Sequence, residues 1–585
     1  MLIEDGRLAR TDGHWAAMGD LDAVRVPPTI EALLATRLDQ LEATERGVIE
    51  RAAVSGKVFW EGAIFKLTPT DSRPKVEAAL RALVRKELIR PERESLGSGS
   101  YSFRHLLILD AAYDAIPKQA RADLHRRFGM WLERATGDRA TEYEEVVGYH
   151  LEQAYLCLAE LGPLDAAALA LAREAARRLG SAGRRAFTLS DPAAGINLIS
   201  RAVALLPADE RLRVELVPNV RAVQAFTRDL TWAERVLTEA VEAAATAGDR
   251  PLAATALVQR GLLRLFTGAE VPPEELIDTA DRAIAVFEEV GDDLGLARAW
   301  RLKGQAHYLA RRAGACVEAS ERALRHVRVA PDRYEERETI EWLVIALLLG
   351  PTRVDEARRR LDVLLAETGG DPLLHAEILA AKAGLVTLLQ GPSHAEEFAA
   401  KSAAIMEEVG THVWIVSFWH SFVYVAKRDP VAAERELRPA YEALKQLGEK
   451  SHFSSVSHGL GNALYHQGRL EEAEQMTREC EAACRPNDIH SHVLWRSTRA
   501  KVLARRGALA EAEALAREAV ELAESSDFLI AHADALMDLA EVLELAGDAD
   551  GATASAAEGR RYFAAKGAAH AAWARGPREL DVADG

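Results

Sequence analysis

The chain contains 585 residues, of which 49% are hydrophobic and 28% are charged. This composition supplies both a core and a solvated surface, which excludes a disordered protein, and the length exceeds what a single core supports. The formal net charge of −17 at pH 7 repels polyanions and argues against nucleic acid as a partner.

The cysteines and the N-terminus both point to the cytoplasm. Four cysteines are too few and too scattered to form a disulfide scaffold in a chain of this size. The first residues carry charge where a secretory signal would be apolar, and no run of about 18 apolar residues is found. We therefore expect a cytoplasmic protein without a membrane span. The cysteines are Cys157, Cys316, Cys480 and Cys484.

The first part of the chain predicts three helices. The two prolines and the threonine of residues 27–29 are typical of the end of one element and the start of a helix, and residues 30–41 carry apolar side chains at helical spacing. Two further helices are predicted around residues 44–54 and 74–86.

A short β-hairpin is predicted after these helices. Residues 88–91 and 101–103 flank a glycine-serine tip at residues 97–100. Three helices followed by such a hairpin indicate a winged-helix-like domain over residues 28–103. Residues 104–165 are expected to be connecting helices.

The junction between these two segments carries an acid, a base and a phenol within a helical turn or two, which suggests catalysis. The favoured interpretation is structural: Phe103, Leu106, Leu109 and Tyr113 form an apolar stripe that docks this domain on the rest of the chain. In that interpretation the charged members of the group form surface or interface pairs. The candidate junction residues are Phe103, Arg104, His105, Asp110 and Tyr113.

Residues 166–585 repeat with a period of about 40 residues. Gly468, Gly507 and Gly547 each close one helix before an acidic, alanine-rich helix begins. Similar turns at earlier positions predict about ten stacked helical hairpins, and therefore an all-α solenoid. The earlier turns are expected near Asp191, Asp229, Gly268, Gly314, Gly350, Gly391 and Asp429.

One repeat unit closely resembles the tetratricopeptide consensus. Residues 460–473 carry that pattern, and Pro486 follows at the end of the second helix. Stacked hairpins of this kind form a concave surface that can hold a peptide, a partner helix or another copy of the chain. Asn462 and Lys501 occupy the consensus position that faces the groove, so they are the candidate partner contacts. The alternative is that both side chains are simply solvated.

A longer resemblance spans essentially the whole chain. Residues 26–41, 51–59 and 101–113 resemble the region just after the nucleotide-binding domain in large bacterial STAND-class signalling ATPases. In that family an ATPase core precedes a winged helix and a tetratricopeptide array, often with an N-terminal nucleotide cyclase. The resemblance implies the sensor half of a signalling protein, with residues 1–27 as a remnant of the end of the ATPase core.

The phosphate-binding loop of that family is missing. No Gly-x-x-x-x-Gly-Lys-[Ser/Thr] motif occurs, so the chain has neither a backbone cradle for phosphates nor the lysine that reaches the terminal phosphate. Gly-x-Ser-x-Gly and His-Glu-x-x-His motifs are also missing. We therefore expect a non-catalytic chain that binds no cofactor.

A metal site is suggested by two thiols followed by two imidazoles, which suit zinc. Cys480, however, stands at a small-residue position of the repeat, where Ala519 stands in the next unit. A packed thiol is therefore the favoured interpretation, and no metal site is predicted. The four residues are Cys480, Cys484, His490 and His492.

Three functions remain open. The favoured one is a regulatory or scaffold protein that binds a protein or peptide partner through its repeat array. The second is a DNA-binding regulator acting through the winged helix, although about 12 basic against about 11 acidic residues between positions 28 and 95 form a weak footprint for phosphate. The third is a fragment of a larger ATPase or nucleotide cyclase whose catalytic domain lies upstream.

Overall fold

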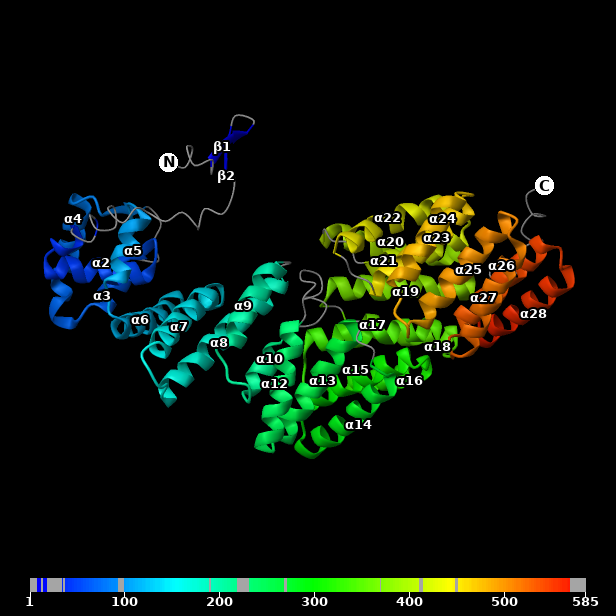
Figure 1. The fold of residues 1–585 in the computed structure, drawn as a ribbon, viewed down its shortest axis with the longest axis horizontal. Coiled ribbons are helices and arrows are strands. Elements are labelled where there is room, and N and C mark those ends of the chain that lie inside the picture. Colours follow the sequence, from blue (N-terminus) through cyan, green and yellow to red (C-terminus); the bar gives the residue numbers. More distant parts are fainter. Residues whose placement is uncertain are drawn as a thin grey trace. The chain divides into compact units, whose positions relative to one another are not determined.

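The protein is an all-α, tetratricopeptide-like solenoid with a small mixed domain near its N-terminus (Figure 1). The computed structural model divides into two units, Met1–Pro207 and Ala208–Gly585, which are described separately. The structure describes residues 8–11, 14–17, 34, 37–92, 99–188, 191–217, 231–267, 271–368, 370–409, 414–447 and 451–568.

The mixed domain of the first unit combines helices with a three-stranded antiparallel sheet of order β3-β5-β4. The predicted hairpin is present, with Ile89 opposite Phe103. A strand and a short helix that were not predicted, β3 and α3, complete the domain. Half of residues 30–41, where a helix is expected, lies outside the described residues, and residues 34 and 37–39 are helical. The elements are α2 (Ala43–Ser55), β3 (Val58–Trp60), α3 (Glu61–Leu67), the 3-10 helix η1 (Thr70–Lys75), α4 (Val76–Arg85), β4 (Ile89–Glu92) and β5 (Ser100–Phe103).

A second hairpin lies in the segment that the sequence analysis assigned to an ATPase remnant. Strands β1 (Leu8–Thr11) and β2 (His14–Ala17) pair antiparallel, with Leu8 opposite Ala17. The rest of residues 1–27 lies outside the described residues.

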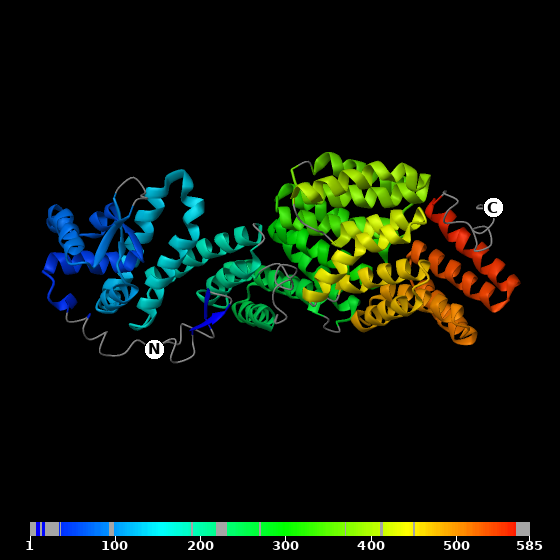
Figure 2. The ribbon, with the colours of Figure 1, turned by 90° about the horizontal axis from the view of Figure 1, so that it is seen from above.

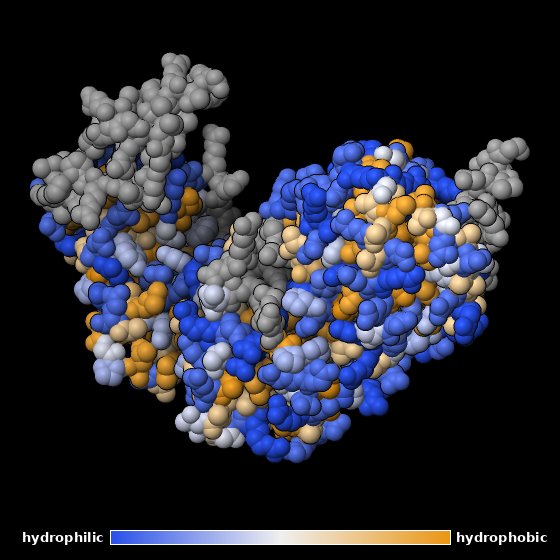
Figure 3. Space-filling model, turned by 45° about the vertical axis from the view of Figure 1, so that its right-hand side comes forward, coloured by the Kyte–Doolittle hydropathy of each residue, from blue (hydrophilic) through white to orange (hydrophobic). Residues whose placement is uncertain are grey.

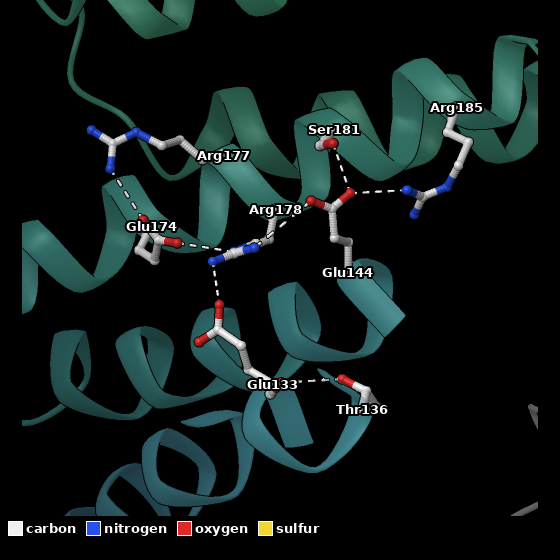
Figure 4. A network of polar contacts seen from close by, with 8 residues as sticks. All are labelled: Glu133, Thr136, Glu144, Glu174, Arg177, Arg178, Ser181 and Arg185. Atoms are coloured by element: carbon white, nitrogen blue, oxygen red, sulfur yellow. Dashed lines mark hydrogen bonds and ion pairs between the residues drawn. The ribbon is translucent and has the colours of Figure 1, made fainter. Parts of the chain in front are cut away.

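Five helices complete the first unit. The division after Pro207 places α8 and α9 in this unit, whereas the sequence analysis placed them at the start of the array. Arg178 of α8 joins three helices through Glu133 of α6, at 2.5 Å, and Glu144 of α7, at 3.7 Å (Figure 4). The elements are α5 (Leu106–Asp114), α6 (Lys118–Thr136), the 3-10 helix η2 (Gly137–Tyr143), α7 (Glu144–Ala159), α8 (Ala166–Thr188) and α9 (Pro192–Ala204).

The second unit is a succession of helices in which neighbours in sequence pack side by side (Figure 2). They are α10 (Arg211–Leu216), α12 (Thr231–Ala247), α13 (Arg250–Thr267), α14 (Pro273–Val290), α15 (Asp293–Leu309), α16 (Ala313–Val329), α17 (Arg333–Leu349), α18 (Val354–Glu367), α19 (Pro372–Gln390), α20 (Pro392–Val409), α21 (Trp414–Ala426), α22 (Pro430–Leu447), α23 (Ser451–His466), α24 (Leu470–Ala483), α25 (Ile489–Arg505), α26 (Leu509–Glu524), α27 (Leu529–Ala546) and α28 (Ala549–Lys566).

The helices end where the repeat pattern places turns. Gly468, Gly507 and Gly547 have φ angles of 75°, 84° and 87°, which is the left-handed conformation that glycine adopts without strain at a helix end. The expected turn at Gly314 is displaced, because α16 already begins at Ala313. Of the remaining expected turns, Asp191, Gly350, Gly391 and Asp429 lie between helices, while Asp229 and Gly268 lie outside the described residues.

Small residues let paired helices approach closely, as the repeat pattern predicts. A Cβ atom on Gly461 of α23 would lie 3.1 Å from the Met476 Cβ atom of α24. Ala473 and Cys480 on α24 are completely buried. The α23–α24 hairpin is therefore packed through positions where a larger side chain would not fit.

The array of the second unit curves until its last helices meet helices more than 200 residues earlier. Lys566, at the end of α28, is completely buried and donates hydrogen bonds to the carbonyls of Leu347 (2.7 Å) and Gly350 (2.6 Å), at the end of α17. The Asp527 carboxylate, just before α27, accepts from the backbone N–H groups of Ala313 (2.6 Å) and Gly314 (2.9 Å). These two contacts close one turn of the solenoid.

One helix, α19, is long and apolar enough to cross a membrane by length and composition alone, a possibility that the sequence analysis did not raise. Within the fold, 72% of its most apolar window is buried, as expected for a core helix. Hydrophilic residues cover most of the surface in view in Figure 3, with hydrophobic residues in small groups among them.

Candidate ligand pocket inside the helical array

A pocket lies within the curved second unit. It encloses about 900 Å³ of space, including the part that is open to solvent. The C-terminal halves of α13, α15 and α17 form one wall, and the N-terminal halves of α21, α23 and α25 face them. The lining residues are Leu265, Gln305, Tyr308, Leu309, Trp342, Ile345, Leu349, Phe418, Trp419, His452, Ser455, Arg485, Asp488 and His490.

Aromatic rings form much of the pocket wall and hold one another in place. Tyr308 meets Trp342 edge to face, with ring centroids 5.2 Å apart, and Phe418 meets Trp419 in the same way at 5.4 Å. Tyr308 also stacks on Phe528 at 5.1 Å. Because Phe528 follows Asp527 at the closure of the solenoid, the closing contacts also support the pocket wall.

Three neutral polar side chains in this apolar wall have buried atoms without a hydrogen-bond partner in the protein. They are both amide atoms of Gln305, the Trp419 Nε1 atom and the His490 Nδ1 atom. Gln305 and Trp419 are each only 2% exposed. Burial lowers the pKa of His490, so its ring is neutral. Such groups cost about 1–3 kcal/mol each when unpaired, so a ligand that bonds them recovers this free energy.

The two charged residues of the lining are engaged with the protein. Arg485 donates a hydrogen bond to the Leu265 carbonyl, which joins the loop before α25 to α13. The Asp488 carboxylate caps α25 by accepting from the Ser491 N–H at 3.1 Å. Because the two charges are opposite, they give the pocket lining no net charge.

A second cavity adjoins this pocket and shares Leu265, Leu309 and Arg485 with it. It encloses about 1070 Å³ including open solvent, and its other lining residues come mainly from the start of α14 and the loop before α25. Arg485 therefore stands at the boundary between the two cavities.

The predicted groove residues lie on the same inner helices but not in the pocket. Lys501 of α25 is 3% exposed, and its Nζ atom lies 2.8 Å from the Asp538 carboxylate of α27 and 3.3 Å from the Asn462 amide oxygen of α23. Burial would lower the pKa of Lys501, but Asp538 and Glu541 outweigh it and raise that pKa. The alternative that Lys501 is solvated is therefore wrong, because its buried ammonium group forms an ion pair with Asp538 of the next repeat. Asn462 is half-buried.

The junction residues do not converge on one point. Phe103 is buried in the core, whereas Arg104 is exposed and pairs with Glu87 at 3.3 Å. His105 is exposed at the start of α5, and Asp110 is exposed on the same helix, where burial and Asp114 raise its pKa. The Tyr113 hydroxyl lies 2.9 Å from the His125 Nε2 atom of α6.

The expected apolar stripe at this junction needs correction. Leu106 stands in the first turn of α5 and is 56% exposed, whereas Phe103 lies in the hydrophobic core of the mixed domain and Leu109 and Tyr113 pack against it, as expected. Ile108 and Ala112, which the predicted stripe did not include, are the buried residues of α5.

A buried histidine pair near this junction was missed by the sequence analysis. The Nδ1 atoms of His125 and His150 lie 2.9 Å apart, and both residues are almost completely buried. Burial, with Arg121 nearby, lowers the pKa of His125 to about 4, and burial with His125 nearby lowers the pKa of His150 to about 3. The pair comes from α6 and α7, and nothing in the local sequence pattern distinguishes these histidines from solvated ones.

Of the residues weighed as a zinc site, the two cysteines lie side by side, while the two histidines contact other groups. Cys480 and Cys484 have Sγ atoms 3.8 Å apart, but the His492 Nε2 atom contacts the Arg485 carbonyl at 3.0 Å and His490 packs edge-on against Phe528. Among the described residues no group of three or more histidine, cysteine or acidic side chains is arranged to hold a metal ion.

No family model matches the chain, and no curated protein sequence matches it. Several solved structures are similar in fold. The APC/C hetero-tetramer Cut9-Hcn1 is 11% identical, over 76% of this chain and 84% of that chain, with a TM-score of 0.49. A STAND protein with a tetratricopeptide repeat sensor from Pyrococcus horikoshii is 12% identical, over 93% and 66%, with a TM-score of 0.34. A Rap protein complexed with competence and sporulation factor is 14% identical, over 59% and 96%, with a TM-score of 0.38.

Proposed function

We propose that this chain is a non-catalytic regulatory or scaffold protein that holds a peptide or protein partner inside its helical array. The observation that carries the proposal is the pocket between α13–α17 and α21–α25, where apolar and aromatic walls surround buried polar atoms without partners. A solenoid core has no need of such atoms, because apolar side chains of the same shape would pack there at lower free energy.

The position of the pocket supports a partner that enters the curve of the solenoid. Its walls come from helices whose sequence positions differ by more than 200 residues, so a ligand there touches helices on both sides of the curved array. A partner bound in this way would stabilise the closed form of the array, and this shift in conformation would signal that the partner is bound. The half-buried amide of Asn462, on the same inner face, is proposed as an additional contact.

Site-specific photo-cross-linking tests this proposal. The photoreactive residue p-benzoylphenylalanine would replace Phe418 in the pocket or, as a control, Val363 on α18, which is 55% exposed and lies outside the pocket. We expect a defined protein or peptide adduct in cells from position 418 and none from position 363. Equal adducts from both positions, or none from position 418, would refute the proposal.

We also propose that the mixed domain of residues 28–103 is winged-helix-like, as the resemblance to STAND-class ATPases implies. The β3-β5-β4 sheet beside α2, α3 and α4 supports this assignment. Four free cysteines support a reducing compartment, and we propose the cytoplasm.

A further inference from the structure

We infer that the pocket inside the array recognises an uncharged peptide segment, taking one aromatic or aliphatic side chain together with its neighbouring backbone amide. This inference rests on the proposed function and specifies the chemistry of the partner. It follows from three properties of the lining: its apolar walls, the donor and acceptor atoms that have no partner, and the engagement of its two charged residues.

The apolar walls select the side chain. Tyr308, Trp342 and Phe418 present ring surfaces, and Ile345 and Leu349 complete the wall on α17. A flat aromatic or a branched aliphatic group packs against such surfaces and gains about 25 cal/mol for each Å² of apolar area removed from water. A small polar group would leave these surfaces without contacts.

The unpaired polar atoms select an amide. The Trp419 Nε1–H group can only donate, the Gln305 side chain offers an NH₂ donor group and an acceptor oxygen, and the Nδ1 atom of neutral His490 can donate or accept. A secondary amide needs an acceptor for its N–H group and a donor for its carbonyl oxygen, and these three residues supply both. Because the atoms are buried, a ligand that lacks the amide leaves them unpaired and is disfavoured.

The engaged charges disfavour an ionic ligand. Arg485 is bonded to the Leu265 carbonyl, and Asp488 caps α25. A carboxylate or an ammonium group entering the pocket would lose its hydration without meeting a lining of opposite net charge. A peptide terminus is therefore a poorer occupant than an internal residue of a peptide chain.

Calorimetric titration of the full chain with four probes tests the inference. The probes are N-acetyl-tryptophanamide, N-acetyl-tryptophan with its free carboxylate, 3-methylindole without an amide, and an acetylated, amidated Ala-Trp-Ala tripeptide. We expect the capped amide to bind about tenfold more tightly than the carboxylate or the plain indole, and the tripeptide to bind at least as tightly as the capped amide.

A substitution ties the selectivity to the pocket. Gln305→Leu should weaken the capped amide about tenfold and leave 3-methylindole unchanged, because only the amide uses the lost donor and acceptor. Gln467→Leu is the matched control: Gln467 lies outside the pocket, where its amide donates to Glu434, and this variant should leave both affinities unchanged.

The opposite outcomes are equally specific. Equal or tighter binding of the carboxylate, or no binding of any probe, would overturn the inference. Binding of the capped amide with exclusion of the tripeptide would overturn it in favour of a free small-molecule amide. If the probes fail while residue 418 still cross-links a partner, the inference is wrong and the proposed function stands.

Discussion

Lys566 provides the sharpest test of how the solenoid is closed. Its amino group, at the end of α28, donates to two carbonyls at the end of α17, and the side chain is completely buried, which lowers its pKa to about 7. Lys566→Met keeps most of the apolar stem but removes both hydrogen bonds and leaves two buried carbonyls without this donor. At about 1–2 kcal/mol for each carbonyl, we expect α28 to open about 2–4 kcal/mol more easily, which is about 30-fold to 900-fold.

Native-state hydrogen exchange measures this effect directly, because repeat arrays open locally at their ends. Amide exchange in residues 549–566, and in residues 340–350 across the contact, should be faster by that factor. The matched control is Lys401→Met: Lys401 is exposed and pairs only with Glu397, so the effect there should stay below about 0.5 kcal/mol. Unchanged exchange in both segments of the Lys566 variant would refute the closing role of this contact.

Three further predictions concern other parts of the fold. The pKa of His125 falls from 6.5 to about 4 on folding, so between these pH values the unfolded chain binds a proton that the folded chain does not bind. The free energy of unfolding should therefore be highest above pH 6.5 and decline by about 3 kcal/mol as the pH falls to 4, and the lowered pKa of His150 should add to this loss. Urea unfolding followed by tryptophan fluorescence checks this. Lys501→Met should lower the free energy of unfolding by about 3 kcal/mol because it leaves the Asp538 carboxylate unpaired. The double variant Lys501→Met/Asp538→Leu should regain most of this stability, and thermal unfolding of both variants measures the effect. Gly461→Val should cost about 1–3 kcal/mol by overpacking α23 against α24, measured in the same way.

Each of these predictions has a control and a result that would contradict it. His125→Gln should weaken the acid sensitivity, and an unchanged pH dependence would show that the histidine pair is not its source. A Lys501→Met variant as stable as the parent would mean that Lys501 is solvated after all. Gly370→Ala adds a Cβ atom with nothing within 4 Å, so it should be neutral, and an equal loss at Gly370 and Gly461 would remove the packing argument.

The helical array was predictable because its signals are local and repeated. Gly468, Gly507 and Gly547 recur with the repeat period, and each adopts the left-handed conformation at a helix end that only glycine accepts easily. Where the repeat was less regular, the predicted turn was displaced: Gly314 lies inside α16 rather than in the turn before it. Leu106 was misassigned because a helical stripe fixes spacing but not which side of a short helix faces the core.

The pocket was not predictable because it depends on the curvature of the whole second unit. Gln305 and Trp419 lie more than 100 residues apart, and nothing in either local sequence indicates that they face one cavity. Lys566 resembles any basic residue near a helix end until the array has closed on α17. The contact between Lys501 and Asp538 carried a weak signal, since the two residues stand about one repeat apart on neighbouring inner helices.

The central claim is that a partner occupies the interior of the closed solenoid, and hydrogen exchange of the chain with and without the partner recovered by cross-linking tests it most directly. We expect slower exchange in residues 305–309, 342–349 and 415–423, which surround the pocket, and unchanged exchange in α18 outside it. Protection confined to α18 and other outer helices, with unchanged exchange around the pocket, would contradict it.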